Sequence, residues 1–238
     1  MAPRVGVLLF PGSNCEQDVI EAVRVIGGEA ELLWHGDTDI GGVDAVVVPG
    51  GFAHGDYLRP GAFARFSRVM SAVSEFAADG GPVVGICNGF QVLTEAGLLP
   101  GALQKNRGLK FLCQMTDVRV ESTESVLTSS ATSGAILRIP INHFEGNYTC
   151  SPETLTELRR DDRVILRYVS NPNGSTDNIA GITNHARNVV GLMPHPERAS
   201  NEMLGSADGL PLLRSLLQSA GAPLAHMSTS LDGSTRPQ

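Results

Sequence analysis

Short apolar runs that stop abruptly at Gly or Pro constrain the fold of this 238-residue chain more than any other feature. They are apolar at nearly every position, so they predict strands that are buried on both faces of a sheet. Segments with helical spacing follow two of them, and strands alternating with helices predict a parallel sheet with right-handed crossovers. The runs span 4–10, 30–34, 45–48 and 83–86, and the helical segments span 15–26 and 63–76.

The second half of the chain has a different pattern. Apolar and polar residues alternate within 110–121 and 136–141, which predicts antiparallel strands that join the parallel ones. We predict one α/β domain over 1–219 and a mobile C-terminal tail over 220–238, rich in Gly, Pro, Ser and Thr. Further β-like runs lie at 163–169, 179–183 and 189–193, and a last helix at about 210–217.

Charge and apolar content exclude several classes of partner. The chain has 18 Lys and Arg against 25 Asp and Glu, a net charge of −7, without a block of like charges. This balance argues against nucleic acid and anionic membranes as partners. No apolar run is long enough to span a membrane and no signal-peptide pattern opens the chain, so we expect a cytoplasmic protein.

One cysteine stands in a motif that suits a nucleophile. In Gly85-Ile86-Cys87-Asn88-Gly89, two glycines flank Cys87 where a strand turns into a helix. Missing Cβ atoms permit a tight turn that projects the side chain, and the free amides of the helix start favour a thiolate and an oxyanion. The motif predicts acyl transfer, and the alternative is a small buried hydrophobic residue.

The other three cysteines have weaker contexts. Cys15 also follows a strand near a helix start but lacks flanking glycines, so we assign it a mainly structural role. Cys113 and Cys150 are expected in the core or on the surface. Their wide spacing predicts reduced thiols and neither a zinc site nor a redox dithiol.

A nucleophilic thiol needs a base, and His195 alone among six histidines has an orienting carboxylate beside it. In Pro194-His195-Pro196-Glu197, a β-like backbone would point His195 and Glu197 to the same side, so that the carboxylate accepts the imidazole N–H. The alternative is a stiff surface loop. Together with the cysteine motif, the segment predicts a triad of Cys87, His195 and Glu197.

The remaining histidines are given lesser roles. His54 and His143 are expected in loops that border the site, and His35 and His185 on the surface or in loops. His226 falls in the predicted tail. No two histidines have the spacing of metal ligands, so no metal site is predicted.

Both motifs resemble those of the class I glutamine amidotransferases. Within that class, the chain resembles the glutaminase subunits of phosphoribosylformylglycinamidine synthase, which act in purine biosynthesis, over about residues 5–217. Departures from the subfamily pattern are Phe144 in place of the usual Gly and His54 where Tyr is common, and both concern loop shape and partner contacts. The strings that carry the narrower resemblance lie at 10–15, 49–59, 88–100, 145–148, 171–175 and 205–209.

The resemblance implies a fold and a site. The fold is a flavodoxin-like three-layer sandwich with a mostly parallel mixed sheet. Cys87 would attack the side-chain amide of glutamine to give a thioester and ammonia, with His195 as base and acid and Glu197 orienting it. An oxyanion hole would come from amides around Gly50, Gly51 and Phe52 and from Asn88, and Gln91 would shape the glutamine pocket.

The resemblance also implies partners. Ammonium is not a nucleophile, so the ammonia must reach its acceptor along a sheltered path. A synthetase subunit would bind ATP, Mg²⁺ and formylglycinamide ribonucleotide, helped by a small third subunit. This chain contains no Walker A sequence, and we expect no cofactor in it.

Two other functions stay open at this point. Related α/β folds with a cysteine at this turn include peptidases and γ-glutamyl hydrolases, which need no partner. A non-catalytic binding module with an inactive pocket is the third alternative.

Overall fold

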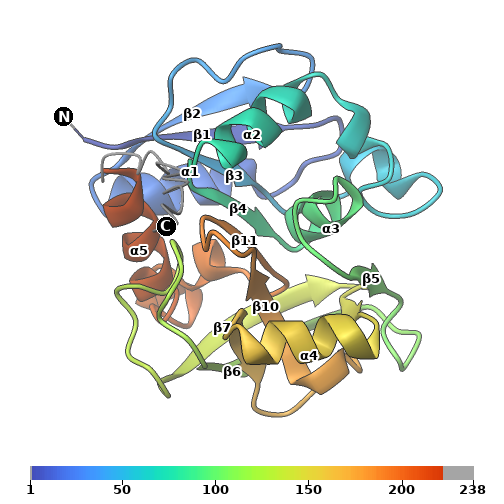
Figure 1. Ribbon diagram of the computed structural model, residues 1–238. Coiled ribbons are helices and arrows are strands. Elements are labelled where there is room, and N and C mark those ends of the chain that lie inside the picture. Colours follow the sequence, from blue (N-terminus) through green and yellow to red (C-terminus); the bar gives the residue numbers. More distant parts are fainter. Residues whose placement is uncertain (1, 222–238) are drawn as a thin grey trace, which may run out of the picture.

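Nine strands of the computed structural model form one mixed sheet in the order β2-β1-β3-β4-β11-β10-β9-β6-β7 (Figure 1). The structure describes residues 2–221. The predicted tail lies outside the described residues from position 222 onward, and so does His226. The mixed α/β architecture is as predicted.

The parallel half of the sheet contains the four strands predicted from continuous apolar runs and a fifth strand, which lies in the later β-like run at 189–193. Each is paired in parallel with its neighbour, and almost every side chain of β3 and β4 is buried. Burial on both faces explains why β1, β3, β4 and β11 do not alternate. For β2 the prediction of burial on both faces is wrong, because β2 is the edge strand of the sheet and most of its residues are exposed. In sheet order they are β2 (Glu29–Trp34), β1 (Arg4–Leu9), β3 (Ala45–Val48), β4 (Val83–Ile86) and β11 (Val189–Leu192).

The other half of the sheet is antiparallel, as the later alternating segments predict. Its long strands alternate between buried and exposed residues because only one face is covered. A separate two-stranded sheet was not predicted, since three-residue strands leave no periodic signal. The antiparallel strands are β10 (Ile179–Thr183), β9 (Val164–Tyr168), β6 (Leu112–Val120) and β7 (Ile136–His143), and the small sheet contains β5 (Ala102–Gln104) and β8 (Asn147–Thr149).

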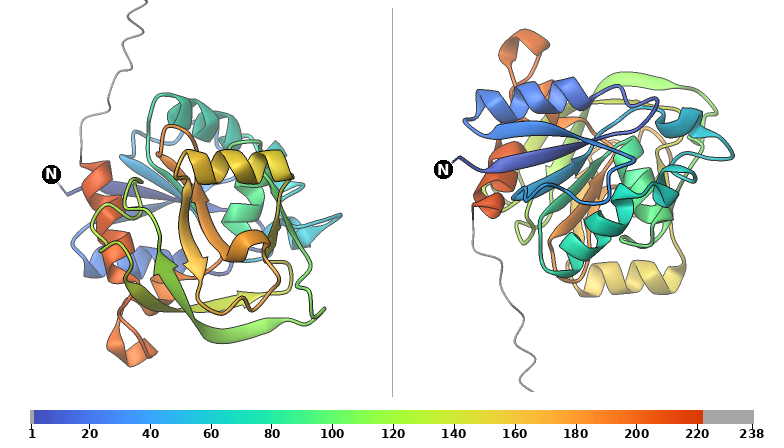
Figure 2. Two further views of the ribbon diagram at one scale, coloured as in Figure 1. Left: turned by 60° about the horizontal axis from the view of Figure 1, so that its bottom comes forward. Right: turned by 90° about the horizontal axis from the view of Figure 1, so that it is seen from above.

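Helices cover both faces of the parallel half (Figure 2). On one face lie α1 (Glu16–Val25) and α5 (Leu210–Ala220), and on the other α2 (Val69–Ala78) and α3 (Asn88–Glu95). The predicted helix over 63–76 divides into a 3-10 turn, Ala64–Phe66, and α2, because the backbone at Ser67 is extended. The chain therefore forms the predicted three layers. Other 3-10 turns occupy Ala53–Asp56, Thr176–Asn178, Pro196–Ala199 and Glu202–Leu204.

One helix escaped the sequence prediction. Helix α4 (Pro152–Arg160) lies over the antiparallel half and buries only Leu158, so it carries little apolar periodicity. Its start signals are local: Ser151 accepts a hydrogen bond from the Thr154 amide at 3.2 Å, and Pro152 stands in the first turn. Within residues 2–221, no helix has the length and apolar character needed to cross a bilayer.

The pairing of β4 with β11 positions the site. The two strands are parallel neighbours in the register Ile86 to Leu192, and the amide of Cys87 donates to the Leu192 carbonyl at 2.8 Å. Parallel strands end at the same edge of a sheet, where open α/β folds bind ligands. The segments after Ile86 and after Leu192 therefore meet, although about a hundred residues separate them in the sequence.

Asn188 is a buried side chain on which this pairing depends. Its Nδ2 donates to the carbonyls of Ala77 and Gly81, each at 2.8 Å, and so ties the end of α2 to the start of β11.

We predict that Asn188→Ala lowers the free energy of unfolding by about 1–3 kcal/mol, because two buried carbonyls lose their donor. Urea unfolding measures this loss. Gln114→Ala, at an exposed position on β6, is the control and should change stability by less than about 0.5 kcal/mol; equal stability of the two variants would contradict the role of Asn188.

Candidate active site

Cys87 lies at a strained turn between β4 and α3. Its backbone has φ 52° and ψ −104°, a conformation that costs energy for a residue with a side chain. A Cβ on Gly89 would lie 1.9 Å from the Val48 carbonyl oxygen, and one on Gly85 would lie 2.6 Å from the backbone of Gly89. Only glycine therefore fits at these two positions. The turn presents Cys87 at the carboxyl edge of the sheet.

The thiol lines a cavity of about 300 Å³. Cys87 is 5% exposed, and its Sγ lies 3.7 Å from the Asn142 carbonyl oxygen, to which the thiol donates. The cavity walls come from the segments that follow β1, β3, β4, β7 and β11, which all end at this edge. Cys87 is thus buried against a cavity and not sealed in the core.

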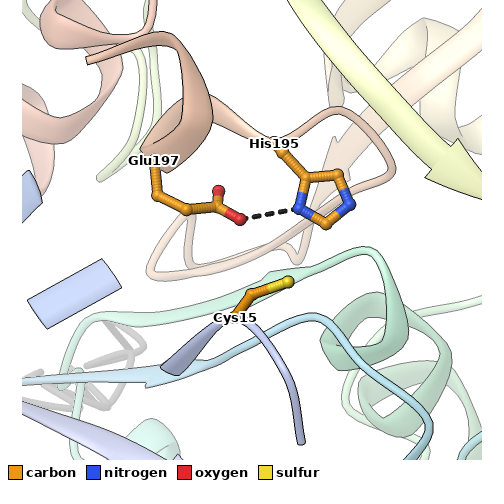
Figure 3. A group of neighbouring side chains, drawn as sticks. All are labelled: Cys15, His195 and Glu197. Atoms are coloured by element: carbon orange, nitrogen blue, oxygen red, sulfur yellow. Dashed lines mark hydrogen bonds and ion pairs between the residues drawn. The ribbon is translucent and has the colours of Figure 1, made fainter. Parts of the chain in front are cut away.

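His195 and Glu197 form a buried pair (Figure 3) at the cavity that Cys87 lines. His195 Nδ1 donates to Glu197 Oε1 at 2.6 Å, and the two side chains are 1% and 0% exposed. The segment is not extended as the sequence argument assumed, since Pro196 begins the 3-10 turn Pro196–Ala199. The turn, and not β-alternation, brings the carboxylate to the imidazole.

Charges around His195 determine its protonation. Burial lowers the pKa of His195, but the Glu197 carboxylate and the Cys87 thiolate outweigh burial and raise that pKa well above its usual value. The protonated form of His195 is therefore favoured. Within the described residues, His195 Nε2 has no hydrogen-bond partner, so this nitrogen is free to give its proton to a reacting group.

The predicted oxyanion amides differ in availability. The Phe52 amide donates to the Gly12 carbonyl at 2.8 Å and is thereby occupied. In the described chain, the amides of Gly51 and Asn88 have no backbone acceptor. Gly50 leaves room for the imidazole because it has no side chain: a Cβ at this position would lie 2.7 Å from His195 Cε1.

A chain of side-chain amides holds the pocket walls together. Asn88 Oδ1 accepts from the Ala53 amide at 3.0 Å, and Asn88 Nδ2 donates to Gln91 Oε1 at 2.8 Å. Gln91 Nε2 donates in turn to the Glu145 carbonyl at 2.6 Å. Gln91 therefore connects α3 to the segment after β7, and it lines the cavity.

Cys15 is the residue whose place the sequence did not reveal. The sequence predicts a mainly structural role for Cys15, but its thiol lies beside the imidazole: donor atoms of Cys15, His195 and Glu197 are all within 4.8 Å of one another. Figure 3 shows the sulfur beneath the imidazole ring. One feature of the sequence could have indicated this position. Cys15 directly follows the turn after β1, and that turn lies at the same edge of the sheet as Cys87. These three side chains are of the types that bind soft divalent cations.

The other predicted histidines divide between pocket and surface. His143 ends β7 and lines the cavity, and burial together with His195 lowers its pKa to about 4. His54 does not line the cavity described by residues 2–221 but packs against His35, with ring centroids 5.2 Å apart. His185 is exposed near Asp161, as a surface residue.

An acidic pair lies at another wall of the cavity. Asp56 and Glu145 both line it, and burial and the nearby Glu145 carboxylate raise the pKa of Asp56 to about 6. Arg59 and Arg198 also line the cavity, but each is paired with another carboxylate, Arg59 with Glu95 at 2.6 Å. The acidic pair is thus a place for a cationic group of a ligand.

Comparisons with known proteins agree on the family. The chain matches the CobB/CobQ-like glutamine amidotransferase domain over residues 2–208. It is 57% identical over 217 residues to a protein of Rubrobacter xylanophilus named phosphoribosylformylglycinamidine synthase subunit PurQ, covering 91% of this chain and 99% of the relative. A protein of Koribacter versatilis with the same name is 52% identical over 227 residues, 90% of this chain and 97% of the relative.

A solved structure has the same fold. A chain of the PurLQS structure from Thermotoga maritima is 41% identical with a TM-score of 0.85, and the match covers 92% of this chain and 99% of that one. The similarity therefore extends over nearly the whole described structure.

The turn geometry generates a prediction for Gly89→Ala. Because the new Cβ would collide with the Val48 carbonyl, we expect the turn to shift and the labelling of Cys87 by iodoacetamide to slow about a hundredfold, as for a reacting group misplaced by about 1 Å. Peptide mass spectrometry measures labelling at each cysteine. Gly108→Ala, where a Cβ meets open space, is the matched control. Unchanged labelling in Gly89→Ala would contradict the geometric role of the glycine.

Proposed function

This chain belongs to the family of CobB/CobQ-like glutamine amidotransferase domains, and on that premise we propose that it is the glutaminase subunit of a phosphoribosylformylglycinamidine synthase. It hydrolyses glutamine to glutamate and ammonia. The observation that carries the proposal is a cavity-lining Cys87 beside a buried His195–Glu197 pair, in a chain whose relatives bear that name.

Each residue of the triad has one part in the reaction. The Cys87 thiolate attacks the amide carbon, and the imidazolium of His195 gives a proton to the departing nitrogen, so that ammonia leaves and a γ-glutamyl thioester remains. His195, now neutral, takes a proton from water, which attacks the thioester and releases glutamate and the thiolate. Glu197 holds the imidazole in place and stabilises its charged form.

Two backbone amides would stabilise the tetrahedral intermediates. We assign this role to the amides of Gly51 and Asn88, because neither has a backbone acceptor in the described chain and both belong to residues at the thiol. The start of α3 adds the positive end of its helix dipole.

Glutamine would be oriented by its charged end. We propose that Asp56 and Glu145 hold the α-ammonium group, because they place two carboxylates in a cavity whose arginines are already paired. Gln91 and Asn88 support this wall through their amide chain.

The ammonia would pass to a synthetase subunit. That subunit binds ATP and Mg²⁺ and converts formylglycinamide ribonucleotide to formylglycinamidine ribonucleotide, with a small third subunit, so ligase and ATP-binding activity belong to the complex and not to this chain. In support of this arrangement, the solved structure from Thermotoga maritima that resembles this chain is one of PurLQS. A reactive thiol that works reduced is suited to the cytoplasm, where we place the reaction.

Replacing the nucleophile tests the function. With the synthetase present, Cys87→Ala should release glutamate at least about a thousandfold more slowly, because no thioester can form. The same complex should still make product from ammonium salts, which shows that assembly is intact. Cys113→Ala, at an exposed site, is the control. Full glutaminase activity in Cys87→Ala would refute the proposal, and turnover of peptides by the isolated chain would favour a partner-independent hydrolase.

The acidic pair gives a pH prediction. Asp56 loses its charge as the pH falls through about 6, so the KM for glutamine should rise below that pH. In Asp56→Asn, we expect a KM about tenfold higher near neutral pH, from loss of one charged contact, and a flatter pH dependence. Steady-state kinetics at fixed ionic strength measure both, with Asp117→Asn on β6 as the control. A wild-type KM profile in Asp56→Asn would remove Asp56 from the binding site.

A further inference from the structure

We propose that Cys15, His195 and Glu197 form a binding site for a soft divalent cation, best suited to Zn²⁺, and that the bound cation switches off Cys87. The cation site itself follows from the geometry alone. Its inhibitory effect rests on the proposed function, because it acts through the histidine assigned as acid and base.

The donor set matches the ligand preference of zinc. A thiol, an imidazole and a carboxylate converge from two segments, the turn after β1 and the turn after β11, with donor atoms within 4.8 Å of one another. Zinc bonds of about 2.0–2.3 Å in tetrahedral geometry require donors about 3.3–3.7 Å apart. Side-chain adjustments of about 1 Å would therefore close the site, with water from the cavity as fourth ligand.

The burial of the three donor side chains is a second, independent reason to expect a bound cation. Cys15 is 3% exposed and His195 and Glu197 are each 1% exposed, so all three donors are held away from bulk water.

The Cys15 side chain is free to take part. Cys15 precedes α1 at the N-cap position, but its side chain makes no capping hydrogen bond. Its backbone amide donates to the Gly50 carbonyl at 3.2 Å, and this bond fixes the position of the sulfur without using it. The same glycine leaves the space in which sulfur and imidazole meet, since a Cβ on Gly50 would lie 3.1 Å from Cys15 Sγ.

The proton balance explains the inhibition. Zinc takes up the thiolate of Cys15 and the lone pair of His195 Nδ1, so one proton leaves Cys15 Sγ and one leaves Nδ1. No electron is transferred. The Nδ1–H bond to Glu197 is lost, and the remaining ring proton stays on Nε2. A zinc-bound imidazole in this form has no lone pair to accept a proton from water, and it gives up its Nε2 proton far less readily than an imidazolium does, so His195 can serve as neither base nor acid.

Binding is tested on the full chain alone, without glutamine or synthetase. In equilibrium dialysis with Zn²⁺, wild type should bind one equivalent, and Cys15→Ala should bind at least about tenfold more weakly. Cys15→Ser, which keeps the side-chain size, should behave like Cys15→Ala and guards against misfolding. Co²⁺ in place of zinc should give a thiolate-to-metal absorption band in wild type and in Cys113→Ala, but not in the Cys15 variants.

Inhibition is tested separately. Zn²⁺ should slow glutamate release by wild type and EDTA should restore it, while each Cys15 variant, compared with its own metal-free rate, should resist the metal. If zinc binds Cys15→Ala as tightly as wild type, or if Cys87→Ala loses the binding, the metal sits on the nucleophile and the proposal is overturned. Metal-free wild type without glutaminase activity would refute the proposed function and leave the dialysis result intact.

Discussion

The pairing of β4 with β11 is the constraint on which the rest of the structure depends. These strands come from distant parts of the chain and run side by side in parallel, so both end at one edge of the sheet. Cys87 follows one strand directly and His195 follows the other by three residues. Without this pairing, the thiol and the imidazole would have no fixed relation, and neither would have a function.

The second requirement is a balanced set of buried charges. A thiolate or a carboxylate alone in the core would be strongly disfavoured, because burial penalises the charged form. Here the imidazolium of His195 lies between Cys87 and Glu197, and its raised pKa reflects that arrangement. Close packing keeps the group in place: a Cβ on Gly50 would collide with the His195 ring, and a Cβ on Gly89 would collide with the Val48 carbonyl beneath the Cys87 turn. The catalytic geometry is therefore a property of the backbone as much as of the three side chains.

The arrangement of the cavity also explains how one site could respond to a substrate, a partner subunit and a metal ion. Its acidic wall, with Asp56 and Glu145, lies on the segments after β3 and β7, whereas Cys15 approaches from the turn after β1. A ligand on the acidic wall and a cation on the Cys15 side would therefore contact different residues. Phe144, the neighbour of Glu145 in the sequence, also lines the cavity.

Sequence alone determined the strands, the alternation that makes the sheet mixed, and the two motifs around Cys87 and His195, because these depend on neighbours along the chain. It missed α4, whose buried face is a single leucine, and the two three-residue strands, because they leave too little periodic signal. Only the tertiary structure decided that a 3-10 turn brings Glu197 to His195, that the Phe52 amide is occupied, and that Cys15 lies against the imidazole. The physical reason is that these contacts join the ends of different strands, and strand order in a sheet is set by packing across the whole core, which no local pattern records.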